Sequence, residues 1–401
     1  MIEKIFHVGI VTGVIILLFV FFPNVLVPQV DTIPDTPQVM AEFTSFKMPP
    51  GFTANVFASD LPGVRVLEED PNGTIIASLT KEGRVVAVTD TDYDGEADEV
   101  VPLIDGLHNP HGLALLCESK NDRECSLYVA ETEQISLYTY DPVARDAEFV
   151  KKVVDLPSMG DRITRTLLAD PSGENIFVSI GSSCEFCQEL DRRYATIQLL
   201  DLKKEKMTTY ANGLYNTVFM AIQPTTGLLW GTEMAPGDPS SAQHFPDEIN
   251  ILRKGKNYGW PFCYGDNLSL EDFQAEEESF FEQCDSSKIP SMLDLPPHSA
   301  PLGLTFIPSE GWPEEYKGDL LVTYHGPSTA KFGDGHRIVR IKMNSKGMPT
   351  GTAEPFMTGF ADEEGRIVGR PVALIARKDG TLLVSGDLRG VIYRVSWQGD
   401  R

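Results

Sequence analysis

The sequence predicts an all-β fold, a six-bladed β-propeller, preceded by one N-terminal transmembrane helix. A phrase of two short strands joined by turns recurs six times, and the 401 residues include 34 Gly and 28 Pro, both frequent in turns. No long apolar period of 3.6 residues follows residue 45, so we expect few helices in the body. The expected organisation is a membrane anchor at 1–27, a tether at 28–45 and one propeller at 46–401.

The N-terminal segment 5–27 is apolar apart from His7, Thr12 and one Pro-Asn pair. An α-helix of this length can cross a bilayer. The residues after it lack the small side chains of a signal-peptide cleavage site, which favours an uncleaved anchor over a cleaved signal peptide. Lys4 precedes the segment, and positive residues tend to stay on the cytoplasmic side. We therefore expect the body to lie outside the cytoplasm, in the periplasm or at the cell surface.

The repeated phrase places two strands in each predicted blade. These strands are rich in β-branched and aromatic residues, and six such units are typical of a propeller. The copies lie at 71–77 with 83–88, 126–130 with 135–138, 171–179 with 195–200, 226–230 with 248–252, 318–323 with 337–341, and 379–385 with 391–395. A further strand, 53–58, is predicted to complete the last blade beside 391–395, which leaves no open sheet edge. An open sandwich is the alternative, and the acidic segment 268–283 is expected to form a short helix in an insertion.

Charge and cysteines limit the partners and the compartment. The formal net charge of −24 repels a phosphate backbone, so we expect no nucleic acid partner. The acidic side chains then serve either to solvate the surface or to bind cations. An even number of cysteines in an exported chain indicates disulfides, although a CxxC also fits a redox or metal motif. The close pairs are Cys117 with Cys125, Cys184 with Cys187, and Cys263 with Cys284.

The segment 90–98 reads D-T-D-Y-D-G-E-A-D and matches the opening of a calcium-binding loop. Carboxylate oxygens at alternate positions surround a hard cation, and the glycine permits the sharp turn. Val101 occupies the twelfth position, so the loop is not a complete EF-hand. An acidic hairpin turn is the alternative to Ca²⁺ binding. The predicted Ca²⁺ ligands are Asp90, Asp92, Asp94 and Asp98.

The most specific stretch joins P-D-E-I-N at 246–250 to G-K-N-Y-G-W-P-F-C-Y-G at 255–265. With these motifs the chain resembles the soluble pyrroloquinoline-quinone-dependent sugar dehydrogenases, and most closely their sorbosone-dehydrogenase-like branch, from about Met48 to Trp397. Further matching phrases lie at 110–114, 181–184, 300–304, 324–326 and 369–372. The resemblance implies a six-bladed fold, a bound pyrroloquinoline quinone, and Ca²⁺ that polarises the quinone.

The resemblance also implies where Ca²⁺ would bind. The family holds Ca²⁺ through two main-chain carbonyls, an acidic pair and a tyrosine. For the acidic pair the alternative is a solvated strand start, and for the tyrosine it is packing between blades. The matching positions are Ala235, Pro236, Asp247, Glu248 and Tyr258.

The chain departs from the family's pattern at three places. In the phrase G-D-R-I-T-R-T-L, Arg162 stands where the family has a histidine that acts as general base, and an arginine stays protonated. In G-L-Y-N, Tyr215 replaces an arginine, whereas Asn216 matches. Leu388 and Arg389 stand where a cofactor-binding lysine is expected.

Loops that enter the blades point toward the central channel, so histidines in them are candidates for the base or for cofactor contacts. Arg370 lies in a Gly-Arg-Pro phrase and is expected to pair with a cofactor carboxylate, with a surface ion pair as the alternative. The predicted catalytic residues are Arg162, Tyr215, Asn216 and His111, with His325 as a further candidate base. The predicted cofactor contacts are His108, Arg165, Arg370 and Arg389.

The resemblance leads to quinone-dependent oxidation of a sugar or polyol, as in aldose or sorbosone dehydrogenases, with electrons passing to an unidentified membrane acceptor. The departures at Arg162 and Tyr215 lead to a second hypothesis, a non-catalytic propeller that binds a glycan or a protein at the cell surface. A Ca²⁺-dependent lactone hydrolase is the third hypothesis, and it rests on fold analogy alone.

Overall fold

A computed structural model defines the body of the chain. It describes residues 46–117, 124–160, 162–185, 187, 189–237, 245–269, 284, 286–327, 335–362 and 364–399. The chain divides into two units, and every described residue belongs to the second, Ser45–Arg401. The predicted anchor (1–27) and tether (28–45) lie outside the described residues. Within the described ranges, no helix is long and apolar enough to cross a membrane.

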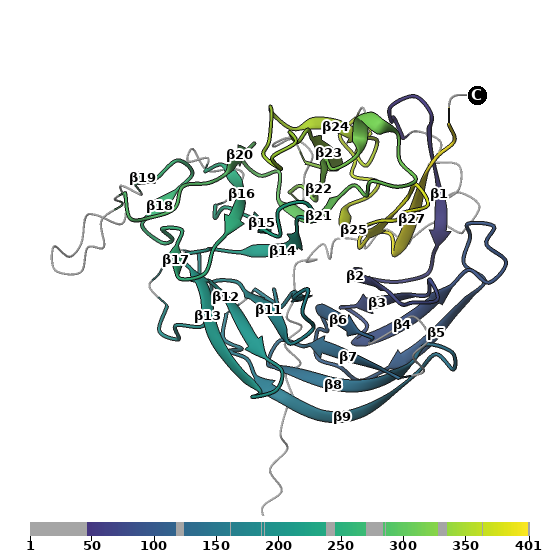
Figure 1. Cartoon of the computed structure of the whole chain (residues 1–401), viewed down its shortest axis with the longest axis horizontal. Helices are drawn as coiled ribbons and strands as arrows, with labels where there is room; N and C mark the ends of the chain where they lie inside the picture. Colours follow the sequence, from purple (N-terminus) through teal and green to yellow (C-terminus); the bar gives the residue numbers. More distant parts are fainter. Residues whose placement is uncertain are drawn as a thin grey trace, which may run out of the picture. The chain divides into compact units, whose positions relative to one another are not determined.

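Six sheets, each built on four antiparallel strands, form the predicted blades around a common axis, which we call the channel (Figure 1). Blade 1 contains β2 (Val64–Glu69), β3 (Ile75–Leu79), β4 (Arg84–Thr89) and β5 (Glu99–Ile104). Blade 2 contains β6 (Gly112–Leu116), β7 (Cys125–Ala130), β8 (Gln134–Asp141) and β9 (Asp146–Asp155). Blade 3 contains β10 (Leu167–Ala169), β11 (Asn175–Ile180), β12 (Thr196–Asp201) and β13 (Lys206–Asn212). The predicted repeat corresponds to the second and third strands of each blade.

The remaining blades follow the same order. Blade 4 contains β14 (Thr217–Ile222), β15 (Leu229–Glu233), β16 (Asp247–Leu252) and β20 (Leu293–Leu295). Blade 5 contains β21 (Pro301–Phe306), β22 (Leu320–Tyr324), β23 (Arg337–Ile341) and β24 (Glu354–Met357), with the 3₁₀ helix η3 (Glu314–Tyr316) between its first two strands. Blade 6 contains β25 (Pro371–Ala376), β26 (Thr381–Gly386), β27 (Val391–Trp397) and β1 (Phe52–Ala58). The prediction of an all-β, six-bladed propeller is therefore confirmed.

Strand β1 closes the ring, as predicted, by pairing with β27. The pairing is antiparallel, with Thr53 opposite Ser396 and Val56 opposite Tyr393. The first described residues reinforce this closure, because Lys47 bridges to Thr358 of the neighbouring blade. One blade thus combines both ends of the propeller, which leaves no open edge between first and last strands.

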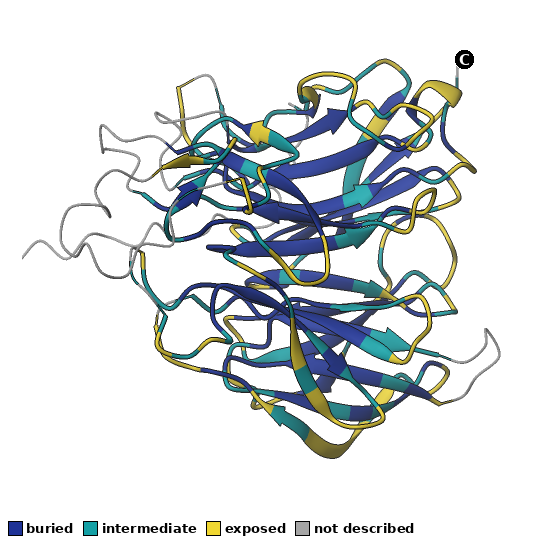
Figure 2. Ribbon diagram, turned by 60° about the vertical axis from the view of Figure 1, so that its left-hand side comes forward, coloured by how far each residue is buried: buried dark blue, intermediate teal, exposed yellow. Residues whose placement is uncertain are grey.

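The first strands of the blades are called the inner strands: β2, β6, β10, β14, β21 and β25. Neighbouring inner strands contact each other around the channel, and between blades 3 and 4 the contact is of β14 with β11. Their sequences are almost free of charge, and in the described chain only β2 supplies ionisable side chains among them: Arg65, Glu68 and Glu69. Apolar side chains of these strands are buried between neighbouring blades, whereas outer strands such as β9 face solvent (Figure 2). Burial of this apolar surface is the main stabilising contribution to the ring.

An insertion between β16 and β20 carries the N-Y-G-W-P phrase to blade 3. Its first strand, β17 (Lys256–Asn257), pairs in parallel with β13, and β18 (Cys263–Tyr264) pairs with β19 (Leu268–Ser269). The predicted helix 268–283 begins with β19, a strand, and from 270 to 283 it lies outside the described residues. All six cysteines form the predicted disulfides, Cys117–Cys125, Cys184–Cys187 and Cys263–Cys284.

Candidate functional site at the mouth of the channel

The site lies at one end of the channel, which we call the mouth. Because adjacent strands are antiparallel, every inner strand begins at the end where the second strand of its blade finishes. Residues just before the inner strands and just after the second strands therefore gather there. This geometry collects single residues from all six blades.

One chain of hydrogen bonds crosses the mouth from blade 1 to blade 4. Arg65 of β2 donates its Nε–H to Nε2 of His111 at 3.1 Å. The other ring nitrogen of His111, Nδ1, lies 3.4 Å from the hydroxyl of Thr166, which donates to the carbonyl of Val218. A guanidinium can only donate, so Nε2 keeps its lone pair for Arg65 and the proton resides on Nδ1. Burial, then the charges of Arg65 and Arg165, hold the pKa of His111 well below its usual range, so its ring is neutral.

A second chain joins Arg65 to blades 5 and 6. Nη1 of Arg65 lies 3.0 Å from Oδ2 of Asp387, which follows β26. The two carboxylate oxygens of Asp387 lie 3.1 and 3.2 Å from Nε2 of His325, which follows β22. Arg370, just before β25, donates to the backbone carbonyls of His325 and Gly326. The side chains of Arg65, Asp387 and His325 are 18, 16 and 13% exposed, so a ligand at the mouth can reach them.

His325 is the histidine of this network whose ring contacts a carboxylate and not a guanidinium. Its Nε2–H donates to Asp387, so Nδ1 carries the lone pair. Burial lowers the pKa of His325 to about 4, although Asp387 opposes this shift. Burial disfavours the charged form of Asp387, but the hydrogen bond from His325 and nearby positive charges still lower its pKa. A neutral imidazole held by an ionised carboxylate can accept a proton.

The network carries excess positive charge. Arg65 and Arg370 are cations, Asp387 is the anion between them, and the two histidines are neutral. Burial lowers the pKa of each of these arginines, yet arginine stays protonated in proteins. A positive centre in a chain of net charge −24 favours an anionic ligand at the mouth.

The side of the mouth formed by blades 3 and 4 is aromatic. The guanidinium of Arg162 lies 4.3 Å from the centroid of the Tyr215 ring, a cation–π contact. Tyr215 in turn packs on Trp260 of the N-Y-G-W-P phrase, with centroids 4.6 Å apart. The two departures from the family's pattern, Arg162 and Tyr215, therefore contact each other and act as one structural unit.

Asn216, next to Tyr215, has an unsatisfied side chain. The residue is 6% exposed, its Oδ1 has no hydrogen-bond partner in the described structure, and its Nδ2 reaches only the sulfur of Met234, at 3.7 Å. A Cβ on Gly181 would lie 2.4 Å from Oδ1, so the glycine leaves the space that the amide needs. A buried acceptor without a donor costs free energy, which a ligand donor would recover.

Asp247 fixes the turn that contains Ala235 and Pro236. Its Oδ1 accepts the N–H of Ala235 at 2.7 Å, and its Oδ2 accepts the hydroxyl of Ser299 and the N–H of Ala300 at 2.9 and 2.8 Å. Burial raises the pKa of Asp247 to about 6. The carboxyl group therefore positions the Ala235–Pro236 backbone, whose carbonyls were predicted to bind Ca²⁺.

Two further carboxyl groups lie beside Asp247. Glu233 of β15 stands opposite Glu248 of β16 and accepts the N–H of Asn216 at 2.7 Å. Glu248 accepts the N–H of Gly265 at 2.6 Å. Burial raises the pKa of Glu248 to about 7 and that of Glu233 well above its usual value, and the neighbouring carboxyls add to both shifts.

One small pocket brings several predicted metal-site residues together. The hydroxyl of Tyr258 already has two backbone partners, because it donates to the carbonyl of Ile251 at 2.6 Å and accepts the N–H of Arg253 at 2.9 Å. The pocket is lined by Ala235, Pro236, Glu248 and Tyr258 together with Tyr215 and Trp260. Within the described chain, the side chains around this pocket do not form a group of three metal-ligating atoms. Such groups occur at two other places, at Asp90, Asp92 and Asp98 and at Cys184, Cys187 and Glu189.

Three predicted cofactor contacts serve other partners. Arg165 is fully buried and donates to the carbonyls of Thr132 and Thr164 at 3.0 and 2.6 Å. His108 is 62% exposed and pairs with Glu133 at 2.7 Å. The third, Arg389, donates to the carbonyl of Val368 at 3.0 Å.

The acidic loop 90–98 lies at the opposite end of the channel from the mouth, in the turn between β4 and β5. Asp98 accepts the N–H and hydroxyl of Thr91, both at 2.6 Å, and Asp94 accepts the N–H of Glu96 at 2.8 Å. Oδ1 of Asp90 is buried without a hydrogen-bond partner in the described structure. Asp90, Asp92 and Asp98 therefore form a group, while Asp94 turns to the backbone.

A family model described as TrAA12-like matches residues 46–398. The chain belongs to the TrAA12-like family. It is 22% identical over 401 aligned residues to the pyrroloquinoline quinone-dependent sugar dehydrogenase of Hypocrea jecorina (strain QM6a), a match that covers 84% of this chain and 81% of that protein. It is 28% identical over 237 residues to an uncharacterized protein of Borreliella burgdorferi, which covers 58% of this chain and 60% of that protein.

Solved structures share the fold of this TrAA12-like propeller. The calcium structure of a Trichoderma reesei enzyme of carbohydrate-active family AA12 has a TM-score of 0.72 at 21% identity, covering 88% of this chain and 97% of that one. The holo form of the pyranose dehydrogenase PQQ domain from Coprinopsis cinerea has a TM-score of 0.70 at 17% identity, with the same coverage. The predicted relation to quinone-dependent sugar dehydrogenases is confirmed, and the sorbosone-dehydrogenase-like branch stays a prediction.

Sequence reasoning missed three members of this TrAA12-like site: Arg65, Asp387 and Glu233. Arg65 is the one cation in an inner strand of the described chain, and the other two stand at or just after the end of a second strand. A search for polar residues at the ends of the repeated strands nearest the mouth would have found the two acids. The same search would also have selected His325, which the sequence named among the candidate bases.

Proposed function

We propose that this propeller oxidises a sugar or polyol with pyrroloquinoline quinone bound over the mouth. The observation that carries the proposal is the partly buried, net positive network of Arg65, Arg370, Asp387 and His325. Pyrroloquinoline quinone is a tricarboxylic acid, so its charge complements this centre. The unsatisfied amide of Asn216 supports a polar ligand at the same end. The relatives of this chain include a protein named as a quinone-dependent sugar dehydrogenase.

In this proposal the chain's own residues divide the work. Arg65 and Arg370 hold carboxylates of the cofactor, and Asn216 contacts its polar edge. When bound, the quinone supplies the two-electron oxidation of a carbon that bears a hydroxyl group. Nδ1 of His325 accepts the proton of that hydroxyl, while Asp387 fixes the ring and stabilises the imidazolium. His111 is a positioning residue, because its Nε2 is already engaged with Arg65.

Titration with pyrroloquinoline quinone in millimolar Ca²⁺, followed by the cofactor's absorbance, tests this proposal. We expect saturable, Ca²⁺-dependent binding and dye reduction with a sugar or polyol panel. Arg370→Gln should weaken binding by about tenfold, because it removes a charged hydrogen bond worth about 1.5 kcal/mol or more. Arg389→Gln is the matched control and should change binding by less than about twofold. Absence of binding to the parent protein would overturn the proposal.

Calcium has two proposed places. One is the Ala235–Pro236 turn, whose carbonyls Asp247 positions beside the cofactor. The other is the loop of Asp90, Asp92 and Asp98, where the unsatisfied oxygen of Asp90 supports cation binding. Calorimetry should give Ca²⁺ heat that Asp92→Ala reduces and Glu96→Ala leaves unchanged. Equal heats for parent and Asp92→Ala would remove the second site.

A non-catalytic binding propeller is the second candidate. The observation that favours it is the stack of Arg162 on Tyr215. These two residues stand where the family has its general-base histidine and an arginine. A glycan screen that gives binding, combined with no quinone binding, would select this alternative.

The compartment is part of the proposal. Three disulfides support a body outside the cytoplasm. The apolar segment 5–27 supports an anchor that keeps the body near a membrane electron acceptor. Carbonate extraction of membranes should leave the full chain in the pellet, and its release into the supernatant would contradict the anchor.

A further inference from the structure

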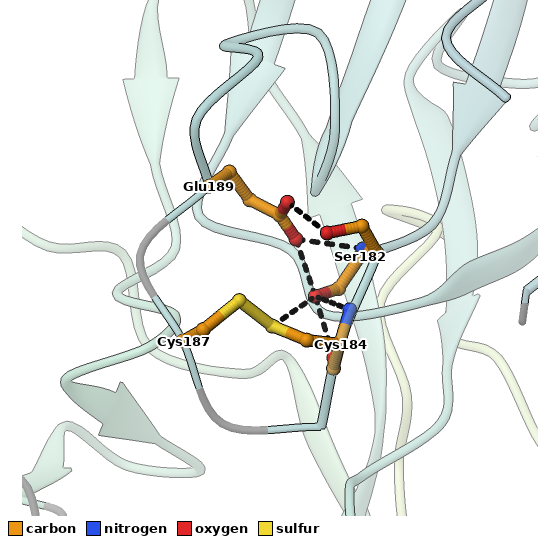
Figure 3. Close-up of a disulfide and its surroundings, with 5 residues drawn as sticks. Ser182, Cys184, Cys187 and Glu189 are labelled. Atoms are coloured by element: carbon orange, nitrogen blue, oxygen red, sulfur yellow. Dashed lines mark hydrogen bonds between the residues drawn. A yellow bond between two sulfur atoms is a disulfide. The ribbon is translucent and has the colours of Figure 1, made fainter. Parts of the chain in front are cut away.

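The loop that the structure describes at residues 181–185, 187 and 189 carries a disulfide between two partly exposed cysteines beside the mouth. It follows β11, and Cys184 and Cys187 are bonded with a sequence separation of 3 (Figure 3). The other two disulfides each join one partly exposed cysteine, Cys117 or Cys284, to one that is 3% exposed, Cys125 or Cys263, whereas both cysteines of this pair are partly exposed. Among the three disulfides of the described chain, this is therefore the one in which neither cysteine is buried away from an external thiol.

Glu189 ties the two ends of this loop together. Its Oε1 lies 2.5 Å from the hydroxyl of Ser182 and accepts the N–H of Ser183 at 2.7 Å (Figure 3). Its Oε2 accepts the hydroxyl of Ser183 at 2.6 Å. The hydroxyl of Ser182 also lies 2.7 Å from the carbonyl of Cys184. The carboxylate and the disulfide therefore stabilise one compact ring.

The ring contacts two segments on the aromatic side of the mouth. The N–H of Ser182 donates to the carbonyl of Tyr215 at 2.7 Å, directly before Asn216. The N–H of Gly237 donates to the carboxylate of Glu185 at 3.2 Å, directly after the Ala235–Pro236 turn. One loop thus links the residue that stacks on Trp260 to the turn that Asp247 positions.

We propose that Cys184–Cys187 is a reducible disulfide whose reduction releases the loop from Tyr215 and Gly237. A thiolate of an external dithiol attacks one sulfur of the bond and forms a mixed disulfide, and the second thiol of the reductant displaces the protein sulfur. The protein gains two electrons and two protons as two cysteine thiols, and the dithiol becomes a disulfide. Without the bond between Cys184 and Cys187, the hydrogen bonds of Glu189 alone do not hold Ser182 and Glu185 in contact with Tyr215 and Gly237.

Release of the loop has a consequence for the mouth, and this part rests on the proposed function. Tyr215 and Gly237 flank the groups proposed to contact the quinone and Ca²⁺. Loss of both loop contacts makes these flanking segments mobile, so the bound state must order them again. The reduced protein should therefore bind quinone several-fold more weakly than the oxidised protein.

Amide hydrogen exchange on the full chain tests the release without any cofactor. After brief treatment with dithiothreitol, alkylation and mass spectrometry should find Cys184 and Cys187 modified before Cys117 and Cys263. Peptides that contain Ser182 or Gly237 should then exchange at least tenfold faster. The double variant Cys184→Ser/Cys187→Ser should reproduce this exchange, and Cys117→Ser/Cys125→Ser, at the opposite end of the channel, should leave both peptides unchanged.

The proposal is overturned if the pair is reduced no faster than Cys263–Cys284, or if reduction leaves both peptides unchanged. Quinone titration of the oxidised and reduced proteins then separates the two claims. Faster exchange without quinone binding to either form would refute the proposed function and leave the loop release intact. Faster exchange with equal affinity in both forms would refute the coupling between the loop and the cofactor.

Discussion

The two sides of the mouth are held by different forces. Blades 1, 5 and 6 contribute Arg65, His325 and Asp387, which charge and hydrogen bonds join. Blades 3 and 4 contribute the stack that contains Arg162 and Tyr215. A hydrogen-bonded ion network fixes the protonation state of each member, whereas a stack fixes shape. The polar side is therefore suited to proton transfer and anion binding, and the aromatic side to forming a wall.

The largest expected effect tests whether the general base lies on the polar side of the mouth. His325→Gln removes the lone pair of Nδ1 while a side-chain amide can still donate to Asp387. We expect quinone-dependent turnover to fall by about 100-fold or more, because a positioned general base contributes about 10²–10⁴-fold. Quinone affinity, measured by absorbance titration, should change by less than about threefold.

His108→Gln is the matched control for this variant. His108 is 62% exposed and pairs with Glu133 at the surface, so its loss should alter turnover by less than about twofold. Equal losses in the two variants would mean that neither histidine is the base. A large loss of turnover in His108→Gln alone would indicate that His108, just before blade 2, is the general base instead of His325.

The aromatic side could be predicted from sequence because its residues belong to contiguous phrases. Tyr215 and Asn216 lie in G-L-Y-N, and Trp260 lies in N-Y-G-W-P, so local patterns identified them. The closing strand was also predictable, because a lone strand at one end of a repeat needs a partner at the other.

The polar side could not be predicted in the same way. Arg65 and Asp387 are 322 residues apart, and nothing in either local sequence indicates the other. Their contact exists because ring closure brings blade 6 beside blade 1. The roles within the phrases were equally hidden: Arg165 donates to buried carbonyls and Tyr258 to a strand, and these partners depend on packing between blades.

The pH dependence of stability should separate the two sides next. The pKa of His325 is lowered from 6.5 to about 4 on folding, so only the unfolded chain binds a proton between these values. Stability from this side therefore falls as pH decreases from about 6.5 to about 4. The pKa of Glu248 is raised from 4.5 to about 7, so its contribution is complete below 4.5 and is lost as pH rises through about 7. The two contributions oppose each other in one window.

Single variants should reveal these opposed contributions. His325→Gln should make the Tm fall less steeply on acidification, and Glu248→Gln should make it fall less steeply as pH rises from 4.5 to 7.5. Each change amounts to a few kcal/mol at most, or several degrees in Tm. Tm values from calorimetry between pH 4 and 8 provide the measurement. Parallel profiles for parent and both variants would contradict the assignment of these two groups.

The smallest expected effect concerns the stack itself. A double-mutant cycle of Arg162→Ala and Tyr215→Leu, measured by urea unfolding, should give a coupling free energy of about 1 kcal/mol, as for a partly buried cation–π pair. The coupling should persist in high salt more than that of the exposed pair of Lys152 with Asp155, which serves as the control. Coupling within about 0.3 kcal/mol of zero would mean that the two residues only adjoin. The aromatic wall would then owe its shape to the packing of Tyr215 on Trp260 alone.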